Sequence, residues 1–152
     1  MIIRELRDED VEPLSVIEAR SFTMPWSAAD FARLIQDRNS QYLVAEVDGR
    51  VVGCCGVTNV SGDGEIDNVV VDEAYRSRGI ATALLRETLR RGYDMGVEAF
   101  TLEVRVSNAP AIHIYEKAGF VSEGIRPHFY EKPTEDAMIL WKRDRKVPES
   151  DS

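Results

Sequence analysis

The hydrophobic period of the chain changes twice between residues 65 and 106, and this constrains the fold more than any other feature. Residues 65–71 contain the β-branched run Val69-Val70-Val71, which is typical of a strand buried on both faces. From residue 80 to about residue 95 apolar side chains recur at helical spacing, and residues 99–106 return to a strand pattern. Strand, helix and strand in this order predict two parallel strands joined by a right-handed crossover.

Antiparallel strands and further helices flank this unit. Residues 42–47 and 50–60 predict a hairpin, because Asp48-Gly49 supplies the positive φ angles that a tight turn requires. Ser27 and Asp30 resemble a capping box that opens a helix, and Asp10 is placed to cap an earlier one. Further strands are predicted at residues 2–6, 120–125 and 137–141, and a further helix at residues 111–118. We therefore expect a mixed α/β fold whose central sheet is flanked by about four helices.

The length and composition are those of one soluble domain. The chain has 152 residues, of which 43% are hydrophobic and 30% charged, and it contains no repeat or low-complexity linker. We expect one domain over residues 1–143, followed by a polar, frayed tail over residues 144–152. No apolar run is long enough to cross a membrane, and the first residues do not resemble a signal peptide, so we expect a cytoplasmic protein.

The charge balance and the few Cys and His residues limit the classes of partner. With 19 Lys and Arg against 27 Asp and Glu, the net charge is -8, which opposes nucleic-acid binding and favours a basic peptide or an amine. Cys54 and Cys55 are neighbours that would point to opposite faces of a strand, so we interpret them as reduced core residues. His113 and His128 lack the spacing of zinc ligands, and no metal is expected.

The segment before the long helix carries two arginines where the helix dipole disfavours cations. Arg76 and Arg78 precede the first helical turn, at a cost of about 0.3–1 kcal/mol each unless an anion lies there. With Gly79 allowing close approach, the backbone N–H groups and the arginines would suit a pyrophosphate. The alternative is that two solvated arginines flank a helix start. The segment matches neither a Walker loop nor Gly-x-Gly-x-x-Gly.

Two motifs together resemble the GNAT acetyltransferases. Arg76-x-x-Gly79-x-Ala81 after the valine run is similar to the acyl-coenzyme A signature of that family. Leu102-Glu103-Val104-Arg105, followed by Ser107-Asn108 and Tyr115-Glu116-x-x-Gly119-Phe120, is similar to the second half of the family's core. The resemblance covers about residues 2–142. It departs from the family at Ala81, where many relatives have Gly.

The two ends of the chain resemble the RimI branch of this family. Phe22 and Pro25-Trp26-Ser27 carry the resemblance near the start, and Arg126, Phe129-Tyr130 and Glu135-Asp136-Ala137 carry it near the end. That branch acetylates the N-terminal alanine of a small-subunit ribosomal protein. The segment after Tyr130 is short beside bacterial examples, which bears on peptide specificity.

The resemblance implies a binding site for acetyl-CoA. The pantetheine arm would insert like an extra strand where two parallel strands part, and Asn108 would bond the cofactor near its thiol end. The pyrophosphate would lie against residues 76–82. The implied cofactor-binding residues are Val69, Val70, Val71, Arg76, Ser77, Arg78, Gly79, Ile80, Ala81, Thr82 and Asn108.

Glu103 is a charged residue within a predicted central strand. Leu102 and Val104 share one face of this strand, so Glu103 lies on the other face with Arg105. From the residues alone, an ion pair with Arg105 is as good an interpretation as a catalytic role. The resemblance implies the catalytic role, in which Glu103 takes a proton from the attacking amine. Because an α-amino group has a pKa of about 8 and a carboxylic acid one near 4.3, we expect Glu103 to act through ordered water or with a raised proton affinity.

Tyr115 has two interpretations. Ile112, Tyr115 and Ala118 recur at helical spacing, so a core position is the simpler interpretation from the residues alone. The resemblance implies instead that Tyr115 faces the departing thiolate as a general acid. Phenol and thiol have pKa values of about 10 and 8.5, so a proton can pass between them when they are aligned. We expect the loss of Tyr115 to slow the reaction without abolishing it.

Aromatic pairs near both ends of the chain are candidates for substrate binding. The resemblance favours Pro25-Trp26 and Phe129-Tyr130 as walls of a peptide channel, and the alternative is that they pack loops onto the sheet. Glu135 and Asp136 either attract a basic peptide or form ordinary solvated surface.

The resemblance implies an acetyl-CoA-dependent N-acyltransferase. We expect it to be a monomer that acetylates the N-terminal α-amino group of a protein, the N-terminal alanine of a small-subunit ribosomal protein being the first candidate. Direct attack in a ternary complex is expected, because no cysteine lies near the predicted site. A polyamine, a lysine side chain or a small metabolite could instead be the acceptor. Two different functions stay open: an acyl-CoA-binding sensor without turnover, and an enzyme that acetylates nucleic acid, which the acidic balance disfavours.

Overall fold

A seven-stranded mixed sheet forms the centre of the computed structural model, which describes residues 1–149 and, at Asn68, the backbone alone. The strand order is β1-β2-β3-β4-β5-β7-β6, with β4 and β5 parallel and the other neighbours antiparallel. The strands are β1 (Ile2–Glu5), β2 (Ser40–Val47), β3 (Arg50–Val60), β4 (Asp63–Val71), β5 (Ala99–Arg105), β6 (Val121–Tyr130) and β7 (Glu135–Lys142). The predicted parallel pair and mixed sheet are confirmed.

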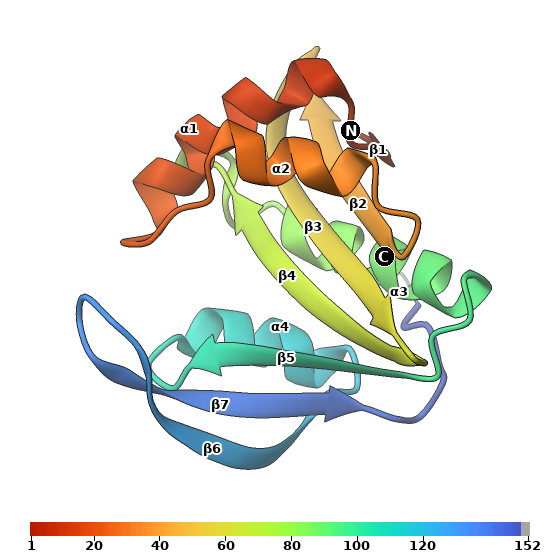
Figure 1. Cartoon of the computed structure of the whole chain (residues 1–152), viewed down its shortest axis with the longest axis vertical. Coiled ribbons are helices and arrows are strands. Elements are labelled where there is room, and N and C mark those ends of the chain that lie inside the picture. The colour runs from red at the N-terminus through yellow and green to blue at the C-terminus, as the bar shows by residue number, and fades with distance from the viewer. Residues whose placement is uncertain (150–152) are drawn as a thin grey trace.

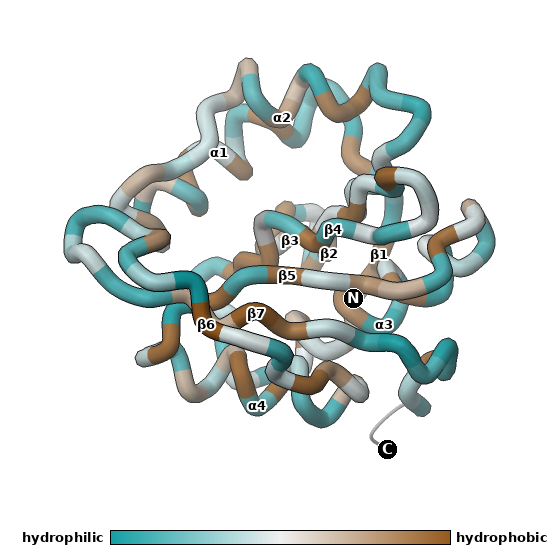
Figure 2. Tube along the Cα trace, turned by 60° about the horizontal axis from the view of Figure 1, so that its bottom comes forward, coloured by the Kyte–Doolittle hydropathy of each residue, from teal (hydrophilic) through white to brown (hydrophobic). Residues whose placement is uncertain are grey.

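Four α-helices cover the two faces of the sheet. They are α1 (Val11–Ser21), α2 (Ala28–Ile35), α3 (Ile80–Asp94) and α4 (Ala109–Lys117). Helices α1 and α2 lie over β2–β4 on one face, which we call the α1–α2 face, and α3 and α4 lie on the opposite face (Figures 1 and 2). Short 3-10 turns, η1 (Asp8–Asp10) and η2 (Glu73–Tyr75), precede α1 and α3. Within residues 1–149, no helix combines the length and the apolar character that crossing a bilayer requires.

Two hydrophobic clusters hold these layers together, one on each face of the sheet. Leu84, Leu89 and Phe100 belong to the cluster beneath α3, and Leu14 and Phe31 belong to the cluster beneath α1 and α2. Burying each such side chain contributes roughly 1.5–3 kcal/mol. One cysteine belongs to each cluster, and both are buried and form no disulfide within residues 1–149, so the core interpretation is confirmed.

Strands β4 and β5 stay paired over a short stretch only and then part. Residues 63–65 of β4 pair with residues 99–101 of β5, and beyond the pair Glu65 and Thr101 no ladder joins the two strands within the described chain. Figure 1 shows β5 turning away from β4 along the rest of its length. The opening lies at the centre of the sheet, so backbone groups that a sheet normally uses for pairing face a gap.

Several predicted boundaries were wrong. Strand β6 continues to Tyr130 rather than ending at residue 125, because a register irregularity lets it bend where His128 has a φ of 53°. Helix α4 begins at Ala109 rather than at residue 111, since Pro110 is tolerated in the first turn. Strand β4 begins two residues earlier than predicted.

The two predicted helix caps had different outcomes. The capping box is confirmed, because the Ser27 hydroxyl accepts from the Asp30 N–H at 3.2 Å and the Asp30 carboxylate accepts from the Ser27 N–H at 2.9 Å. Asp10 occupies the N-cap position of α1 but makes no cap hydrogen bond there. Its carboxylate instead pairs with Arg4 at 2.8 Å and accepts from the Arg7 N–H.

Candidate active site

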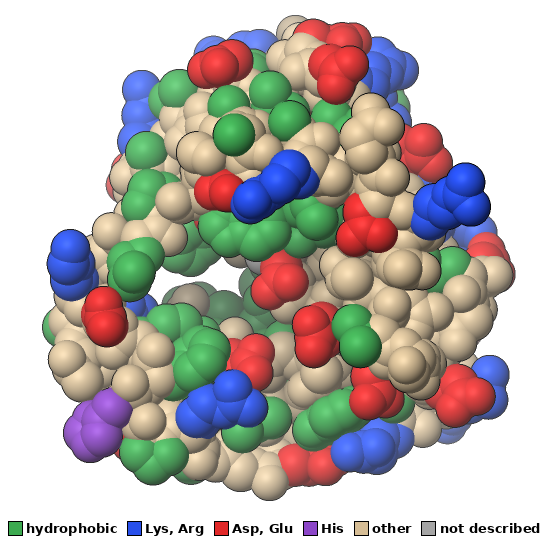
Figure 3. Space-filling view, viewed as in Figure 1, with side chains coloured by type: hydrophobic (Ala, Val, Ile, Leu, Met, Phe, Trp, Pro, Cys, Tyr) green, Lys and Arg blue, Asp and Glu red, His purple; other side chains and the backbone are tan. Residues whose placement is uncertain are grey.

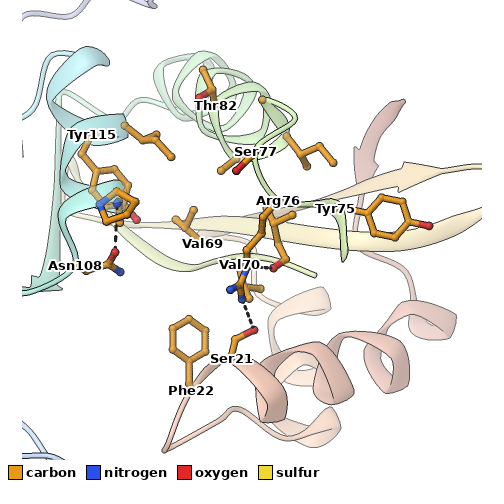
Figure 4. A pocket seen from close by; sticks show the side chains of 17 residues that line it. Ser21, Phe22, Val69, Val70, Tyr75, Arg76, Ser77, Thr82, Asn108 and Tyr115 are labelled. Atoms are coloured by element: carbon orange, nitrogen blue, oxygen red, sulfur yellow. Dashed lines mark hydrogen bonds between the residues drawn. The ribbon is translucent and has the colours of Figure 1, made fainter. Parts of the chain in front are cut away.

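A cavity of about 560 Å³ lies beside the gap between β4 and β5, bounded by the end of α1, the start of α3 and one side of α4 (Figure 4). Most of the predicted cofactor-binding residues lie in its wall. They are Val69, Val70, Val71, Arg76, Ser77, Gly79, Ile80, Ala81, Thr82 and Asn108. Tyr115 also lines the cavity, so the fold brings both ends of the predicted cofactor site into one space.

The loop that enters α3, residues 76–79, presents unpaired backbone donors to this cavity. Ser77 and Gly79 both adopt left-handed conformations, with φ of 64° and 79°. Within the described chain, the backbone N–H groups of residues 77–82 donate no hydrogen bond. Such donors at the positive end of a 15-residue helix favour an anion, and a left-handed residue on each side of Arg78 helps the N–H groups of this loop to form a concave set.

The two arginines of this loop do different things. The Arg76 Nε donates to the carbonyl oxygen of Val71 at 3.0 Å, and a terminal nitrogen of its guanidinium donates to the Ser21 hydroxyl at 3.3 Å (Figure 4). Arg76 therefore ties the loop to β4 and to the end of α1. Arg78 lies outside the cavity wall and stacks over the ring of Tyr75 at 5.1 Å.

Tyr115 and Asn108 lie at the other end of the cavity from Arg76 and Ser77, with Val69 between them (Figure 4). The Tyr115 ring is 7% exposed and packs edge-on against Phe120, with ring centroids 5.8 Å apart. Burial raises the pKa of the Tyr115 phenol, so it keeps its proton at neutral pH. Tyr115 therefore has the predicted core position and also lines the cavity, and its role as a general acid stays a prediction.

Asn108 also has a structural contact. Its side-chain oxygen accepts from the Ala111 N–H at 3.3 Å and caps α4. The side-chain amide group remains in the cavity wall.

Glu103 lies on the α1–α2 face, on the far side of the sheet from α4. Leu102 and Val104 are buried in the opposite cluster, which confirms the predicted alternation. The predicted ion pair with Arg105 is wrong. The Arg105 guanidinium instead pairs with Glu135 at 3.2 Å and donates to carbonyl oxygens of the loop between β6 and β7, whereas Glu103 lies 3.6 Å from Arg126.

The predicted aromatic walls lie on two different elements. Trp26 packs near Tyr42 and Phe31, with ring centroids 6.2 and 5.5 Å away, so it covers the α2 side of the α1–α2 face. Tyr130 lies under Arg105 at 4.6 Å, on the hairpin of β6 and β7. Its pKa is raised to about 12, first by burial and then by the charge of Glu103.

The remaining predicted wall residues have fewer contacts. Phe129 packs edge-on against Tyr130 at 5.0 Å and under Arg126 at 5.2 Å. Pro25 is exposed in the connection between α1 and α2 and is not among the residues that line the cavity.

Glu135 and Asp136 are engaged within the protein. Glu135 accepts from the Ser107 N–H at 2.8 Å. The pKa of its carboxyl is lowered first by the Ser107 side chain, then by this backbone bond and by the contact with Arg105. Asp136 accepts from the His128 N–H at 3.0 Å. Both acidic groups therefore hold the β6–β7 hairpin in place. This structural role explains why they are there without any need for them to bind a basic peptide.

Sequence reasoning missed several residues of the site. Ser21, Tyr75, Pro110 and Ile114 line the cavity because helix ends far apart in sequence meet there. Asp67 on β4 was also missed. Its side chain is exposed, and its pKa is raised to about 6, first by partial desolvation and then by the charges of Glu65 and Glu103. The alternation of acidic and apolar residues from Asp63 to Asp67 indicates only that the acidic side chains share one face of β4.

The α1–α2 face is hollowed beside these residues. Figure 3 shows an opening between the half of the molecule that carries α1 and α2 and the half that carries β5–β7, with acidic side chains along its rim. Within residues 1–149, no three His, Cys, Asp or Glu side chains are arranged to hold a metal ion. The cavity at the gap therefore offers backbone N–H donors that suit an anion, and the α1–α2 face beside it offers carboxylates.

Known proteins resemble this chain over nearly its whole length. The model of the acetyltransferase (GNAT) family matches residues 11–120. A protein of Bacillus subtilis (strain 168), provisionally named a ribosomal protein bS18-alanine N-acetyltransferase, is 37% identical over 140 residues, which cover 91% of this chain and 93% of that protein. An N-alpha-acetyltransferase of Sulfurisphaera tokodaii is 32% identical over 151 residues, 91% of this chain and 90% of that protein.

A solved structure agrees with these relatives. The crystal structure of the ribosomal-protein-S18-alanine N-acetyltransferase from Escherichia coli matches with a TM-score of 0.85 at 29% identity, over 98% of this chain and 95% of that one.

Proposed function

We propose that this chain, which belongs to the acetyltransferase (GNAT) family, transfers an acetyl group from acetyl-CoA to the N-terminal α-amino group of a protein. One observation carries the proposal. The gap that opens after Glu65 and Thr101 lies between an anion-binding cavity and a face that carries Glu103. A thioester that enters from the cavity would meet an amine that arrives from the α1–α2 face.

The cavity suits the shape and charge of acetyl-CoA. The N–H groups of residues 77–82 would bind the pyrophosphate, and the arginine at position 78, free of ion pairs within the described chain, would turn toward it. The unpaired edge of β4 near Val69 would hydrogen-bond the amide groups of the pantetheine arm. The thioester would then lie at the end where Tyr115 is buried.

The reaction would proceed by direct attack. The ammonium group of the acceptor first gives one proton to Glu103, directly or through water. The neutral nitrogen then bonds to the thioester carbonyl carbon, the C–S bond breaks, and the second proton leaves the nitrogen for the departing thiolate or for water. Because the pKa of Tyr115 is raised, full transfer of its proton to a thiolate is uphill, so Tyr115 would chiefly stabilise the thiolate by a hydrogen bond. Both cysteines are buried in the two cores, which leaves no thiol in the cavity wall for an acyl-enzyme.

The names of the relatives support a protein N-terminus as the acceptor. The relatives from Bacillus subtilis and Escherichia coli are named for ribosomal protein bS18 and its alanine, and the archaeal relative is named an N-alpha-acetyltransferase. We therefore place the N-terminal alanine of a small-subunit ribosomal protein first among acceptors. The carboxylates on the α1–α2 face would attract its ammonium group.

Four substrates test this proposal. The purified protein is incubated with acetyl-CoA and a peptide that begins with alanine, the same peptide blocked at its N-terminus but carrying an internal lysine, spermidine, or free alanine. Thiol release gives the rate, and mass spectrometry locates the acetyl group. We expect fast transfer to the N-terminus of the free peptide alone. Preference for spermidine or for the lysine would mean that the acceptor is a different amine from the one proposed. If coenzyme A binds but none of the four amines causes release of the thiol from acetyl-CoA, the protein binds acyl-CoA without turnover.

A further inference from the structure

Two carboxylates face each other across the gap between β4 and β5. Glu65 and Thr101 form the last register pair before the strands part. Alternate residues of a strand share a face, so Asp67 and Glu103, each two residues further along, continue on the same face as that pair. The charge of Glu103 contributes to the electrostatic environment of Asp67, which agrees with this placement.

On the side of β4 away from the gap, Asp67 has neighbours on strands β2 and β3. Tyr42, Gly56 and Asp67 are neighbours in one cross-strand row. A Cβ atom on Gly56 would lie 2.2 Å from the Tyr42 ring, so this ring lies directly over Gly56 and extends toward Asp67. Trp26 packs against the same ring. Asp67 is thus at the end of an aromatic surface and at the edge of the gap.

No cation balances Asp67 within the described chain. Glu103 has Arg126 at 3.6 Å and Glu135 has Arg105 at 3.2 Å, but Asp67 has no hydrogen bond or ion pair among the described residues. Its nearest charges are those of Glu65 and Glu103. A carboxylate beside other carboxylates, open to water at the mouth of a reaction site, has strong reason to bind a cation.

We propose that Asp67 is a second acceptor-binding carboxylate, which binds the ammonium group of the acceptor from the β4 side of the gap while Glu103 approaches it from the β5 side. This rests on the proposed function. An ammonium group offers three N–H donors, so it can satisfy both carboxylates and still point its nitrogen at the gap. An acylated nitrogen carries no charge and would leave Asp67 without a cation, whereas Glu103 still has Arg126, so Asp67 favours free amines over acylated ones.

The test compares Asp67→Asn with Asp63→Asn. Asp63 is on the same strand and exposed, and its substitution removes the same charge four residues before Asp67, where β4 and β5 are still paired. We expect Asp67→Asn to raise the KM for the alanine peptide about tenfold, with the affinity for acetyl-CoA unchanged, and Asp63→Asn to leave both near wild type. An unchanged acceptor KM in Asp67→Asn would overturn the proposal.

A pH profile separates binding from a structural effect. The titratable and charged side chains around Asp67 are Glu65 on β4, Glu103 on β5, Tyr42 on β2, Cys55 on β3 and Tyr130 on β6, with Arg126 beside Glu103. The pKa values of both tyrosines and of the thiol are raised, so none of these three titrates near neutral pH.

Asp67 loses its charge as the pH falls through about 6, and acceptor binding should weaken with it. Log kcat/KM for the peptide should therefore fall more steeply below about pH 6 in the wild type than in Asp67→Asn. Equal slopes in the two proteins would count against the role of Asp67.

Binding measured without turnover distinguishes this proposal from the proposed function. Calorimetry follows the alanine peptide and spermidine as they bind to the folded protein saturated with coenzyme A. If the wild type binds an amine that it never acetylates and Asp67→Asn binds it about tenfold more weakly, the proposed function fails and the role of Asp67 stands. If Asp67→Asn binds as the wild type does, or the wild type binds no amine, the role of Asp67 is refuted. Asp67→Ser serves as a second variant if Asp67→Asn does not fold.

Discussion

Arg126 and Glu103 form an ion pair on the α1–α2 face, with Nη1 of Arg126 3.6 Å from Oε1 of Glu103. Both side chains are partly exposed, so the pair is screened and contributes about 0–1 kcal/mol. An incoming ammonium group has to displace Arg126 from Glu103. We therefore expect Arg126→Ala to lower the KM for a cationic peptide about two- to fivefold, and high salt to shrink the difference. A higher KM in this variant would mean that Arg126 contacts the acceptor itself.

Glu103→Gln tests whether this carboxylate takes the proton of the amine. At neutral pH most of an α-amino group is protonated, since its pKa is about 8, and we expect kcat to fall by about 10²–10⁴. At higher pH more free amine is present, so the loss should become smaller. The pH dependence of kcat for both proteins is the measurement, and Glu123→Gln, which changes an exposed glutamate paired with Arg143, is the control. An equal loss at every pH would contradict a base role.

Tyr115→Phe isolates the phenol oxygen. The ring contact with Phe120 is preserved in this variant, so the fold should be kept. Because the pKa of Tyr115 is raised above its ordinary value of 10, the phenol is protonated throughout the working range. The expected loss in kcat, about 10- to 100-fold, should therefore not change between about pH 6 and pH 9. Stopped-flow release of the thiol measures it, and a loss of acetyl-CoA affinity instead would assign Tyr115 a purely structural role.

Arg78→Glu tests the anion-binding role of the loop at residues 76–79. The substitution places a negative charge beside the N–H groups at the start of α3, and we expect affinity for coenzyme A to fall at least about tenfold. Arg38→Glu makes the same change in net charge at an exposed position away from the cavity, and it should leave the affinity unchanged. Calorimetry with coenzyme A at two salt concentrations checks both variants. Equal affinities for Arg78→Glu and wild type would rule out a pyrophosphate at this loop.

Local patterns predicted the parts of the site that local sequence controls. The glycine at position 79, at the start of α3, and the side of β5 that carries Glu103 both follow from short-range rules of turn and strand geometry. The ion-pair partner of Glu103 does not follow from such short-range rules. Arg105 is two residues away on the same strand, whereas Arg126 arrives on β6, which β7 holds at a distance set by a non-local register.

Asp67 was missed for a related physical reason. Its importance comes from the point at which β4 and β5 stop pairing, and no residue in either strand marks that point in the sequence. The row of Tyr42, Gly56 and Asp67 spans three strands, so it exists only once their registers are fixed. Motifs thus predicted most of the residues that line the cavity, and the opposite face of the gap depended on tertiary structure.

Gly56→Ala tests the packing that places the Tyr42 ring beside Asp67. The new Cβ would lie 2.2–2.4 Å from three atoms of the Tyr42 ring, and this ring is only 5% exposed, so it cannot move away freely. We expect a loss of about 1–3 kcal/mol in the free energy of unfolding, measured by urea denaturation. When Tyr42 is first replaced by Ala, the clash is absent, and Gly56→Ala should then be neutral or stabilise by about 0.5–1 kcal/mol, because alanine suits a strand interior better than glycine. If Gly56→Ala lowers the free energy of unfolding equally in the wild type and in Tyr42→Ala, the backbone conformation at residue 56 requires glycine. The Tyr42 ring would then not be what excludes a side chain there.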